Sequence, residues 1–192
     1  MAKIAISGGI GAGKSTLAKR LLDRGYPVID ADQIAKECLN QPFVINQVTQ
    51  RFPELNGLTE PDFRKALARI VFQSPDELAW LESIIHPYVK ESINELYEES
   101  NNELFFVEVP VLAATKDYDH VLVVAAPERV RIERLKNKGF DEIDIQNRLL
   151  AQPDTENFLA AADFIFDGEL SDNDAEKALT VLLSELTKKI HE

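Results

Sequence analysis

The sequence predicts an α/β fold in which a doubly wound, mostly parallel sheet of about five strands carries a helical insertion and a small lid. Short apolar runs typical of strands alternate with segments of helical periodicity. A glycine-rich run separates the first strand from the first helix. A long, almost entirely helical stretch follows the second strand, so we expect one compact unit with an insertion.

The chain opens as strand, loop and helix. Residues 3–7 form a β-branched apolar run that ends in glycines, and residues 15–24 carry apolar side chains at helical spacing. Residues 26–29 predict a second strand, which ends directly at Asp30 and Asp32. Because ligand-binding residues of open α/β sheets commonly lie at the carboxyl ends of strands, we expect both aspartates in the site.

Residues 33–100 predict helices almost throughout, with the clearest apolar stripe in residues 63–71. Two further helices are expected to flank His86 and Pro87, with the proline at or near the first turn of the second helix. No linker rich in Gly, Ser or Pro sets this stretch apart. We therefore expect an insertion over about 33–102 and not a separate domain.

Strand character returns after the insertion. Residues 104–109 and 121–125 are continuous apolar runs, as in buried parallel strands, and residues 164–166 predict a last strand. The expected helices of this part cover about 128–138, 143–150 and 174–190. We expect a single unit over residues 1–192, with a core of about 1–32, 103–127 and 160–192 and a lid of about 128–152.

Composition argues against several classes of function. The 192 residues include 33 acidic and 21 basic ones, so the formal net charge is −12. A general nucleic-acid binder needs a basic footprint, so we expect no nucleic-acid partner. No stretch approaches the roughly 18 consecutive apolar residues of a membrane span, and we see no signal-peptide pattern. The single cysteine, Cys38, rules out an internal disulfide and fits a reducing cytosol. We therefore expect a cytoplasmic protein that is not associated with a membrane.

Residues Gly8 to Ser15 match the phosphate-binding pattern G-x-x-x-x-G-K-[ST] between a predicted strand and a predicted helix. Glycines let the backbone wrap around an anion, so that N–H groups point at the β- and γ-phosphates. Lys14 adds a mobile positive charge, and the Ser15 hydroxyl is placed to bind Mg²⁺. The alternative is a glycine-rich turn that happens to hold a lysine. The expected contacts to ATP are Gly9, Gly11, Ala12, Gly13, Lys14, Ser15 and Thr16.

A P-loop NTPase fold does not by itself define a reaction, because GTPases, transport ATPases and small-molecule kinases share it. A GTPase or motor would normally show a Walker B strand ending in Asp, together with switch or base-reading motifs. Here the corresponding strand ends in Val107-Glu108-Val109-Pro110. Glu108 either supports the metal through water or is structural, and the sequence leaves both readings open.

Six segments together resemble bacterial dephospho-coenzyme A kinases in order and spacing, over nearly the whole chain. They are GGIGAGKST, VIDAD, DFRKALARIVF, IIHP, VEVPVL and RLLAQ. The family is similar in outline to nucleoside monophosphate kinases. The resemblance implies transfer of the ATP γ-phosphate to the ribose 3′-hydroxyl of dephospho-coenzyme A, the last step of coenzyme A synthesis. ATP and dephospho-coenzyme A are the expected partners of a monomer or weak homo-oligomer.

The resemblance also suggests roles for residues on the acceptor side. By position, Asp32 matches the family's candidate base, a carboxylate that holds the acceptor hydroxyl in line and takes its proton late. Further acceptor contacts are implied at Asp30, Arg64, His86 and Pro110. The residues alone leave alternatives open, since aspartate is a favoured helix N-cap and an isolated histidine is usually structural.

In the lid, the resemblance implies nucleotide contacts for Arg134 and Arg148 and a catalytic cation at Lys138; Lys14 of the phosphate loop is the other expected catalytic cation. Two lid positions depart from the family pattern. Lys138 stands where arginine is usual, and Phe158 replaces a basic residue. Lysine keeps the charge but lacks the planar fork of arginine. We therefore expect a working enzyme whose lid uses Arg134, Lys138 and Arg148. A slower enzyme and a relative that binds nucleotide without catalysis are the alternatives.

A third departure follows the strand that ends near Glu108. The stretch Pro110-Val111-Leu112-Ala113-Ala114 lacks the acidic residue that the family carries there. A kinase for another small acceptor, such as a nucleoside monophosphate or shikimate, is the alternative enzyme.

Overall fold

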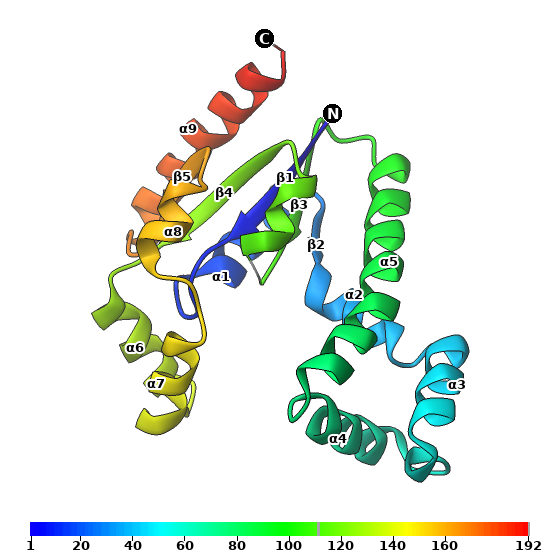
Figure 1. Ribbon diagram of the computed structural model, residues 1–192. Helices are drawn as coiled ribbons and strands as arrows, with labels where there is room; N and C mark the ends of the chain where they lie inside the picture. Colours follow the sequence, from blue (N-terminus) through cyan, green and yellow to red (C-terminus); the bar gives the residue numbers. More distant parts are fainter. Residues whose placement is uncertain (111, 192) are drawn as a thin grey trace. The chain divides into compact units, whose positions relative to one another are not determined.

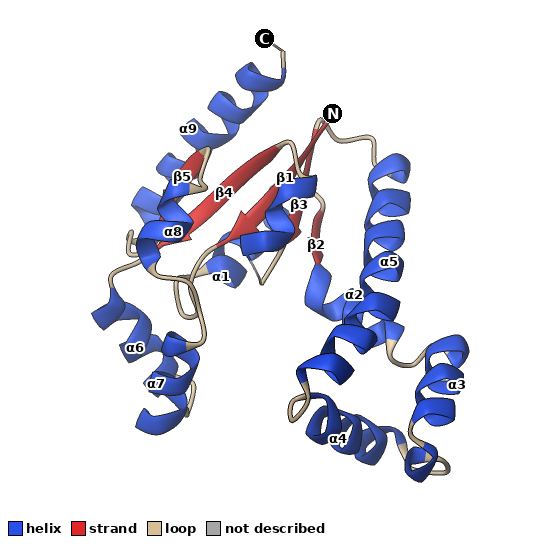
Figure 2. Ribbon diagram, in the orientation of Figure 1, coloured by secondary structure: helices blue, strands red, loops and turns tan. Residues whose placement is uncertain are grey.

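The computed structural model describes residues 1–110 and 112–191. It divides into two compact units. The first comprises residues 1–30 and 100–192, and the second comprises residues 31–99. Figure 2 shows that the strands of the described chain all belong to the first unit, whereas the second is helical.

The first unit is built on a five-stranded sheet, counted over the described residues, with the order β2-β3-β1-β4-β5 (Figure 1). The strands are β1 (Ala2–Ser7), β2 (Val28–Asp30), β3 (Leu104–Glu108), β4 (His120–Ala125) and β5 (Phe164–Asp167). All four pairings between neighbouring strands of this sheet are parallel, which confirms the predicted fold class. The register aligns Ile6 and Asp30 with Glu108 at the carboxyl ends of their strands.

Helices cover both faces of this sheet. The helices of the first unit are α1 (Lys14–Asp23), α6 (Glu128–Asn137), α7 (Glu142–Leu150), α8 (Thr155–Ala160) and α9 (Asp172–Ile190), with a 3₁₀ helix at Leu112–Asp117. Leu17 of α1 and Leu179 of α9 pack in one apolar cluster with strand residues such as Ile4. Phe158 of α8 packs against Val121 and Val123, whose side chains point to the other face because side chains alternate along a strand.

Helix α8 was not predicted. It has only six residues, and a segment this short holds less than two turns, so its apolar side chains cannot show a helical period. Its place against β4 comes from burial of Phe158, whose side chain is 3 % exposed.

The second unit consists of α2 (Ala31–Cys38), α3 (Pro42–Arg51), α4 (Glu60–Val71) and α5 (Pro75–Glu99), with a 3₁₀ helix at Pro53–Leu55. Its core gathers apolar side chains from all four α-helices. Buried members of that core are Cys38, Val44, Val48, Phe52, Leu55, Phe63, Leu67, Val71 and Leu81. Burial raises the pKa of the Cys38 thiol, so the cysteine is a small apolar core residue.

The prediction of two helices flanking His86 and Pro87 is wrong. Helix α5 continues through Pro87 as one element of 25 residues. A proline inside a helix removes one backbone hydrogen bond at a cost of about 3 kcal/mol. The helix buries Leu81 before the proline and Ile93 after it, and this tertiary packing offsets the local penalty.

Ion pairs join α1 to α9 along the outside of the first unit. Arg20 pairs with Asp172 and Glu176 at 2.5 Å each, and Arg24 reaches Glu176 at 2.7 Å. Hydrogen bonds from Arg24 and Arg20 hold the pKa of the Glu176 carboxyl below its usual value. These ion pairs link α1, the helix that follows the glycine-rich loop, to α9.

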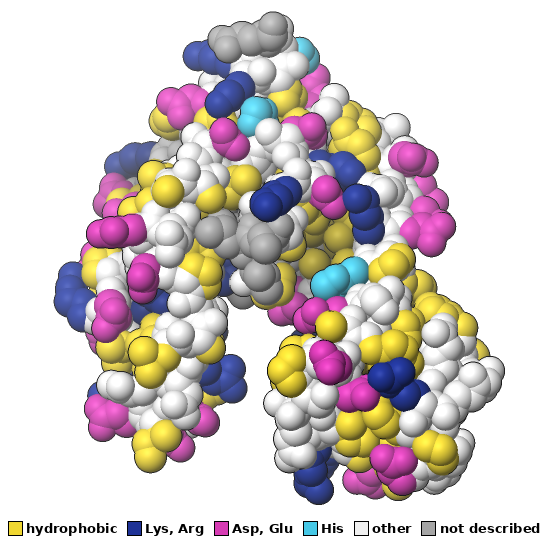
Figure 3. Space-filling view, viewed as in Figure 1, with side chains coloured by type: hydrophobic (Ala, Val, Ile, Leu, Met, Phe, Trp, Pro, Cys, Tyr) yellow, Lys and Arg dark blue, Asp and Glu magenta, His cyan; other side chains and the backbone are white. Residues whose placement is uncertain are grey.

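The surface carries mixed charge. On the face seen in Figure 3, Lys and Arg side chains lie scattered among Asp and Glu side chains. Within residues 1–110 and 112–191, no helix combines the length and apolar character that a membrane crossing requires.

Candidate active site

The loop between β1 and α1 has the shape of a phosphate cradle. It runs from Gly8 to Gly13, and Gly13 caps α1 with a φ of 114°, a value that favours glycine. A Cβ on Gly8 would collide with the backbone oxygen of Val124, so the loop packs tightly on β4. The N-terminus of α1 follows the loop directly, and the N-terminus of a helix is a favourable position for a bound anion.

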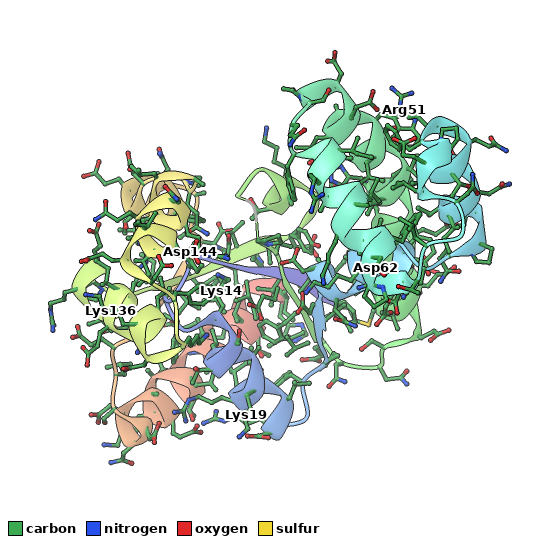
Figure 4. All side chains as sticks on the ribbon, turned by 90° about the horizontal axis from the view of Figure 1, so that it is seen from below. Lys14, Lys19, Arg51, Asp62, Lys136 and Asp144 are labelled. Carbon is green, nitrogen blue, oxygen red and sulfur yellow. The ribbon has the colours of Figure 1, made fainter. Side chains whose placement is uncertain are left out.

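The Lys14 side chain folds back over this loop. Its Nζ donates to the carbonyl of Gly8 at 2.8 Å and to that of Gly9 at 3.4 Å. Figure 4 labels Lys14 at the start of α1, close to the middle of the view. The loop and its lysine thus place N–H donors and a positive charge around one small region, which suits a bound phosphate.

Ser15 and Glu108 come together from different elements. The Ser15 hydroxyl, in the first turn of α1, lies 3.5 Å from Oε1 of Glu108 at the end of β3. Hydroxyl and carboxylate oxygens are the ligands that Mg²⁺ prefers. In the described part of the chain, no group of three or more His, Cys, Asp or Glu side chains could hold a metal. A magnesium ion here would therefore need most of its ligands from water and nucleotide phosphates, as is usual for Mg²⁺.

Arg134 of α6 holds the loop from the side of the predicted lid. Its Nη1 donates to the carbonyls of Gly11 at 3.2 Å and Ala12 at 2.9 Å. Its Nη2 donates to the carbonyl of Gly168, after β5, at 2.6 Å. The guanidinium thus joins the phosphate cradle to the β5–α9 connection, and the family resemblance implies a nucleotide contact for this residue.

Two more side chains pin Ile10 at the tip of the loop. Gln152, after α7, accepts a hydrogen bond from the Ile10 N–H at 2.7 Å, and Arg131 Nε donates to the Ile10 carbonyl at 2.9 Å. The sequence did not single out Arg131. The one signal that could have found it is its spacing of three residues from Arg134, which places both side chains on one face of α6.

The other predicted lid residues lie on α6, α7 and α8. Lys138 is the exposed C-cap residue of α6, and Arg148, in the last turn of α7, stacks on the Phe140 ring with 4.6 Å between Cζ and the centroid. Lys136 and Asp144, labelled in Figure 4, belong to these same two helices. Phe158, at the position of the missing basic residue, is buried on β4. Val111, in the stretch after β3 that differs from the family pattern, lies outside the described residues.

The predicted acceptor residues fall in several elements. Asp30 ends β2, and Asp32 follows in the first turn of α2. Pro110 is exposed two residues after the end of β3, and His86 is exposed on α5. Asp30 and Pro110 thus both lie where parallel strands end, which is the edge of an α/β sheet where ligands commonly bind.

Arg64 of α4 is held within the helical unit. Its Nη2 donates to the Lys36 carbonyl at 3.2 Å and to Asn40 Oδ1 at 2.9 Å, and lies 2.8 Å from Glu60 Oε1. Its Nε is buried and has no hydrogen-bond partner among the described residues. A buried donor without a partner is costly, so this guanidinium has unmet capacity for an acceptor such as a phosphate oxygen.

Comparisons with known proteins agree on one family. The family model described as Dephospho-CoA kinase matches residues 2–174. A dephospho-CoA kinase of Helicobacter pylori is 36% identical over 193 residues, which cover 95% of this chain and 96% of the relative.

Two solved structures are similar over nearly the whole chain. The Thermus thermophilus protein TT1252 has a TM-score of 0.84 and 33% identity, covering 96% of this chain and 97% of its own. A dephospho-CoA kinase from Campylobacter jejuni has a TM-score of 0.72 and 26% identity, covering 97% and 98%. With an intact phosphate loop and a family model that matches most of its length, the chain belongs to the dephospho-CoA kinase family.

Proposed function

We propose that this enzyme transfers the γ-phosphate of ATP, bound with Mg²⁺, to the ribose 3′-hydroxyl of dephospho-coenzyme A. The observation that carries the proposal is the cradle from Gly8 to Ser15, formed with Lys14 folded over it, in a chain that matches the family over residues 2–174. Phosphoryl transfer requires positioning and charge stabilisation more than covalent chemistry, and such a cradle supplies both.

On the donor side, the loop and α1 bind the β- and γ-phosphates. Lys14 leaves the carbonyls of Gly8 and Gly9 and reaches the phosphate oxygens when nucleotide binds, because a phosphate is a stronger partner for an ammonium than a neutral carbonyl. Ser15 would hold Mg²⁺ directly, with Glu108 behind it through water. The ion would supply positive charge to the phosphate oxygens during transfer.

On the acceptor side, Asp32 orients the 3′-hydroxyl and accepts its proton. The loose transition state of phosphoryl transfer develops little negative charge on the attacking oxygen until late, so a carboxylate of ordinary basicity suffices. We propose that Arg64, His86, Asp30 and Pro110 contact dephospho-coenzyme A. The buried, unpartnered Nε of Arg64 supports a role in binding an anionic acceptor.

In the lid, Lys138 and Arg148 provide cations that neutralise charge on the transferred group, and Arg134 contacts the nucleotide. Lys138 is exposed at the end of α6, so its ammonium is available. We propose that residues 128–152 form this lid, that residues 33–102 bind the acceptor, and that the remaining residues form the nucleotide-binding core.

The deciding experiment measures ADP release by pure protein with ATP and Mg²⁺. The expected result is ADP formation that depends on dephospho-coenzyme A, with a product carrying its new phosphate on the 3′-oxygen by phosphorus NMR. AMP and shikimate, offered as acceptors in parallel, should give only background. ADP release without dependence on dephospho-coenzyme A, or a preference for another acceptor, would refute the proposal.

We also propose that the protein works in the cytoplasm, as a monomer or weak homo-oligomer and without a nucleic-acid partner. A single, buried cysteine and a net charge of −12 support these expectations. Light scattering at assay concentration tests the oligomeric state, and a filter-binding assay with duplex DNA and RNA tests the absence of nucleic-acid affinity.

A further inference from the structure

Arg131 is a buried arginine packed against the phosphate loop. Only 7 % of the residue's surface is exposed. Its Nε donates to the Ile10 carbonyl at 2.9 Å, and its Nη1 lies 3.5 Å from the Thr155 hydroxyl. A Cβ built on Gly9 would lie 2.6 Å from both Cζ and Nη2 of Arg131. The guanidinium therefore fills the space directly beside the loop backbone at Gly9.

The positive charge of this side chain has no hydrogen-bonded carboxylate over the described ranges, residues 1–110 and 112–191. Burial lowers the pKa of the Arg131 guanidinium, and the charge of Glu128 opposes that effect more weakly. Buried charges are costly unless an opposite charge pairs with them, so a buried guanidinium whose hydrogen-bond acceptors are neutral indicates a place for a counter-charge. Beside a phosphate cradle, the fitting counter-charge is the polyphosphate of the bound nucleotide.

Arg131 also completes the support of the loop tip. Ile10 is held at both its N–H, by Gln152, and its C=O, by Arg131. Arg134, one turn further along α6, holds the next two carbonyls. The three consecutive residues 10–12 are thus fixed by side chains that follow them by more than 120 positions in sequence.

We propose that Arg131 is a positioning residue for nucleotide binding. Its guanidinium holds the tip of the phosphate loop in the conformation that accepts a polyphosphate, and its charge adds to the attraction for that anion. The inference rests on the proposed function, in which this loop binds ATP. It adds Arg131, which lies outside the P-loop motif, to the residues that determine affinity for the nucleotide.

The first test substitutes Arg131→Gln, with Arg129→Gln as a matched control on the same helix. Arg129 has a side chain that is 74% exposed and pairs with Glu169. For Arg131→Gln we expect Kd for ADP and KM for ATP to rise about tenfold, the effect of losing one charged hydrogen bond. KM for dephospho-coenzyme A should stay within about twofold, as should every constant of the control.

A merely structural arginine would give a different result. Loss of folded protein lowers the active concentration and so reduces apparent kcat without a selective change in KM for ATP. ADP affinity is therefore measured by titration calorimetry below the melting temperature of each variant. Kd for ADP within about twofold of wild type, or equal loss of affinity for both substrates, would overturn the inference.

The second test uses Gly9→Ala. Gly9 does not adopt a left-handed φ, and the nearest atoms to its added Cβ are those of the Arg131 guanidinium, so the substitution displaces that side chain. We expect Gly9→Ala to weaken ADP binding about as much as Arg131→Gln, and the double variant to be no weaker than either single one. Additive losses would show that Gly9 acts independently of Arg131 and would contradict the inference.

These readouts separate the inference from the proposed function. ADP binding needs no acceptor. If dephospho-coenzyme A is not phosphorylated but Arg131→Gln still weakens ADP binding, the proposed function fails and the positioning role stands. If turnover is normal but ADP affinity is insensitive to Arg131, only the positioning role fails.

Discussion

Replacing Phe158 with lysine tests whether this position belongs to the lid chemistry or to the core. By family resemblance, a basic residue at 158 would restore a lid cation and raise turnover. The structure predicts the opposite, because the Phe158 side chain is 3 % exposed and packs on Val121 and Val123 of β4. A lysine at this position must either bury its ammonium or leave the pocket.

The magnitude follows from the packing that is lost. Truncating a buried phenylalanine costs about 3–5 kcal/mol. The apolar stem of lysine covers part of the exposed surface while its ammonium reaches water, so we take the low end, roughly 3 kcal/mol. For a chain of this length each kcal/mol lowers the melting temperature by about 2–4 °C, so the expected decrease is roughly 6–12 °C.

The assay is thermal unfolding followed by circular dichroism, together with turnover measured below the lower melting temperature. Leu159→Lys is the matched control, because it introduces the same charge one residue further on, at a residue that is 38 % exposed. The control should cost less than about 1 kcal/mol. A Phe158→Lys protein that melts within about 2 °C of wild type and turns over faster would refute the reasoning.

Three other substitutions test separate parts of the structure. Asp32→Asn should reduce kcat strongly while KM for ATP changes less than about twofold, and equal loss of both would make the aspartate structural. Gly8→Ala should lower the free energy of unfolding in urea by more than Gly25→Ala. Both glycines have a positive φ, but only a Cβ at position 8 meets a backbone atom, the oxygen of Val124. Glu176 has a pKa below 4.5 in the folded protein, so its ionised carboxylate stabilises the fold above about pH 4.5, and this stability is lost as the pH falls through the folded pKa. In Glu176→Gln, the melting temperature should therefore fall less steeply below about pH 4.5 than in wild type. Identical slopes in the two proteins would contradict that assignment.

The phosphate loop and the parallel sheet were predictable because both follow from local rules. The loop needs glycines at defined positions, and the buried strands need continuous apolar runs, so each leaves a pattern within a few residues. The predicted runs at 3–7, 104–109 and 121–125 match β1, β3 and β4 to within one residue at each end.

Other elements could not be predicted because tertiary packing overrides local preference. Proline disfavours a helix interior by its intrinsic chemistry, yet α5 passes through Pro87, because Ile85 before it and Tyr88 after it both pack on the core of the second unit. Phe158 carries no local signal that separates a core anchor from a missing lid cation. Only its burial on β4 distinguishes the two.

By itself, the sequence determined that this protein has a nucleotide-binding α/β core with a helical insertion, and the resemblance of its motifs indicated the family that the comparisons confirm. The tertiary structure alone decided how the loop is supported. Arg131 and Arg134 reach loop carbonyls 121 to 123 positions earlier in the chain. Such contacts depend on how β4 and α6 pack beside the loop. Every residue has a backbone carbonyl, so the sequence does not show which carbonyl a distant side chain will bind.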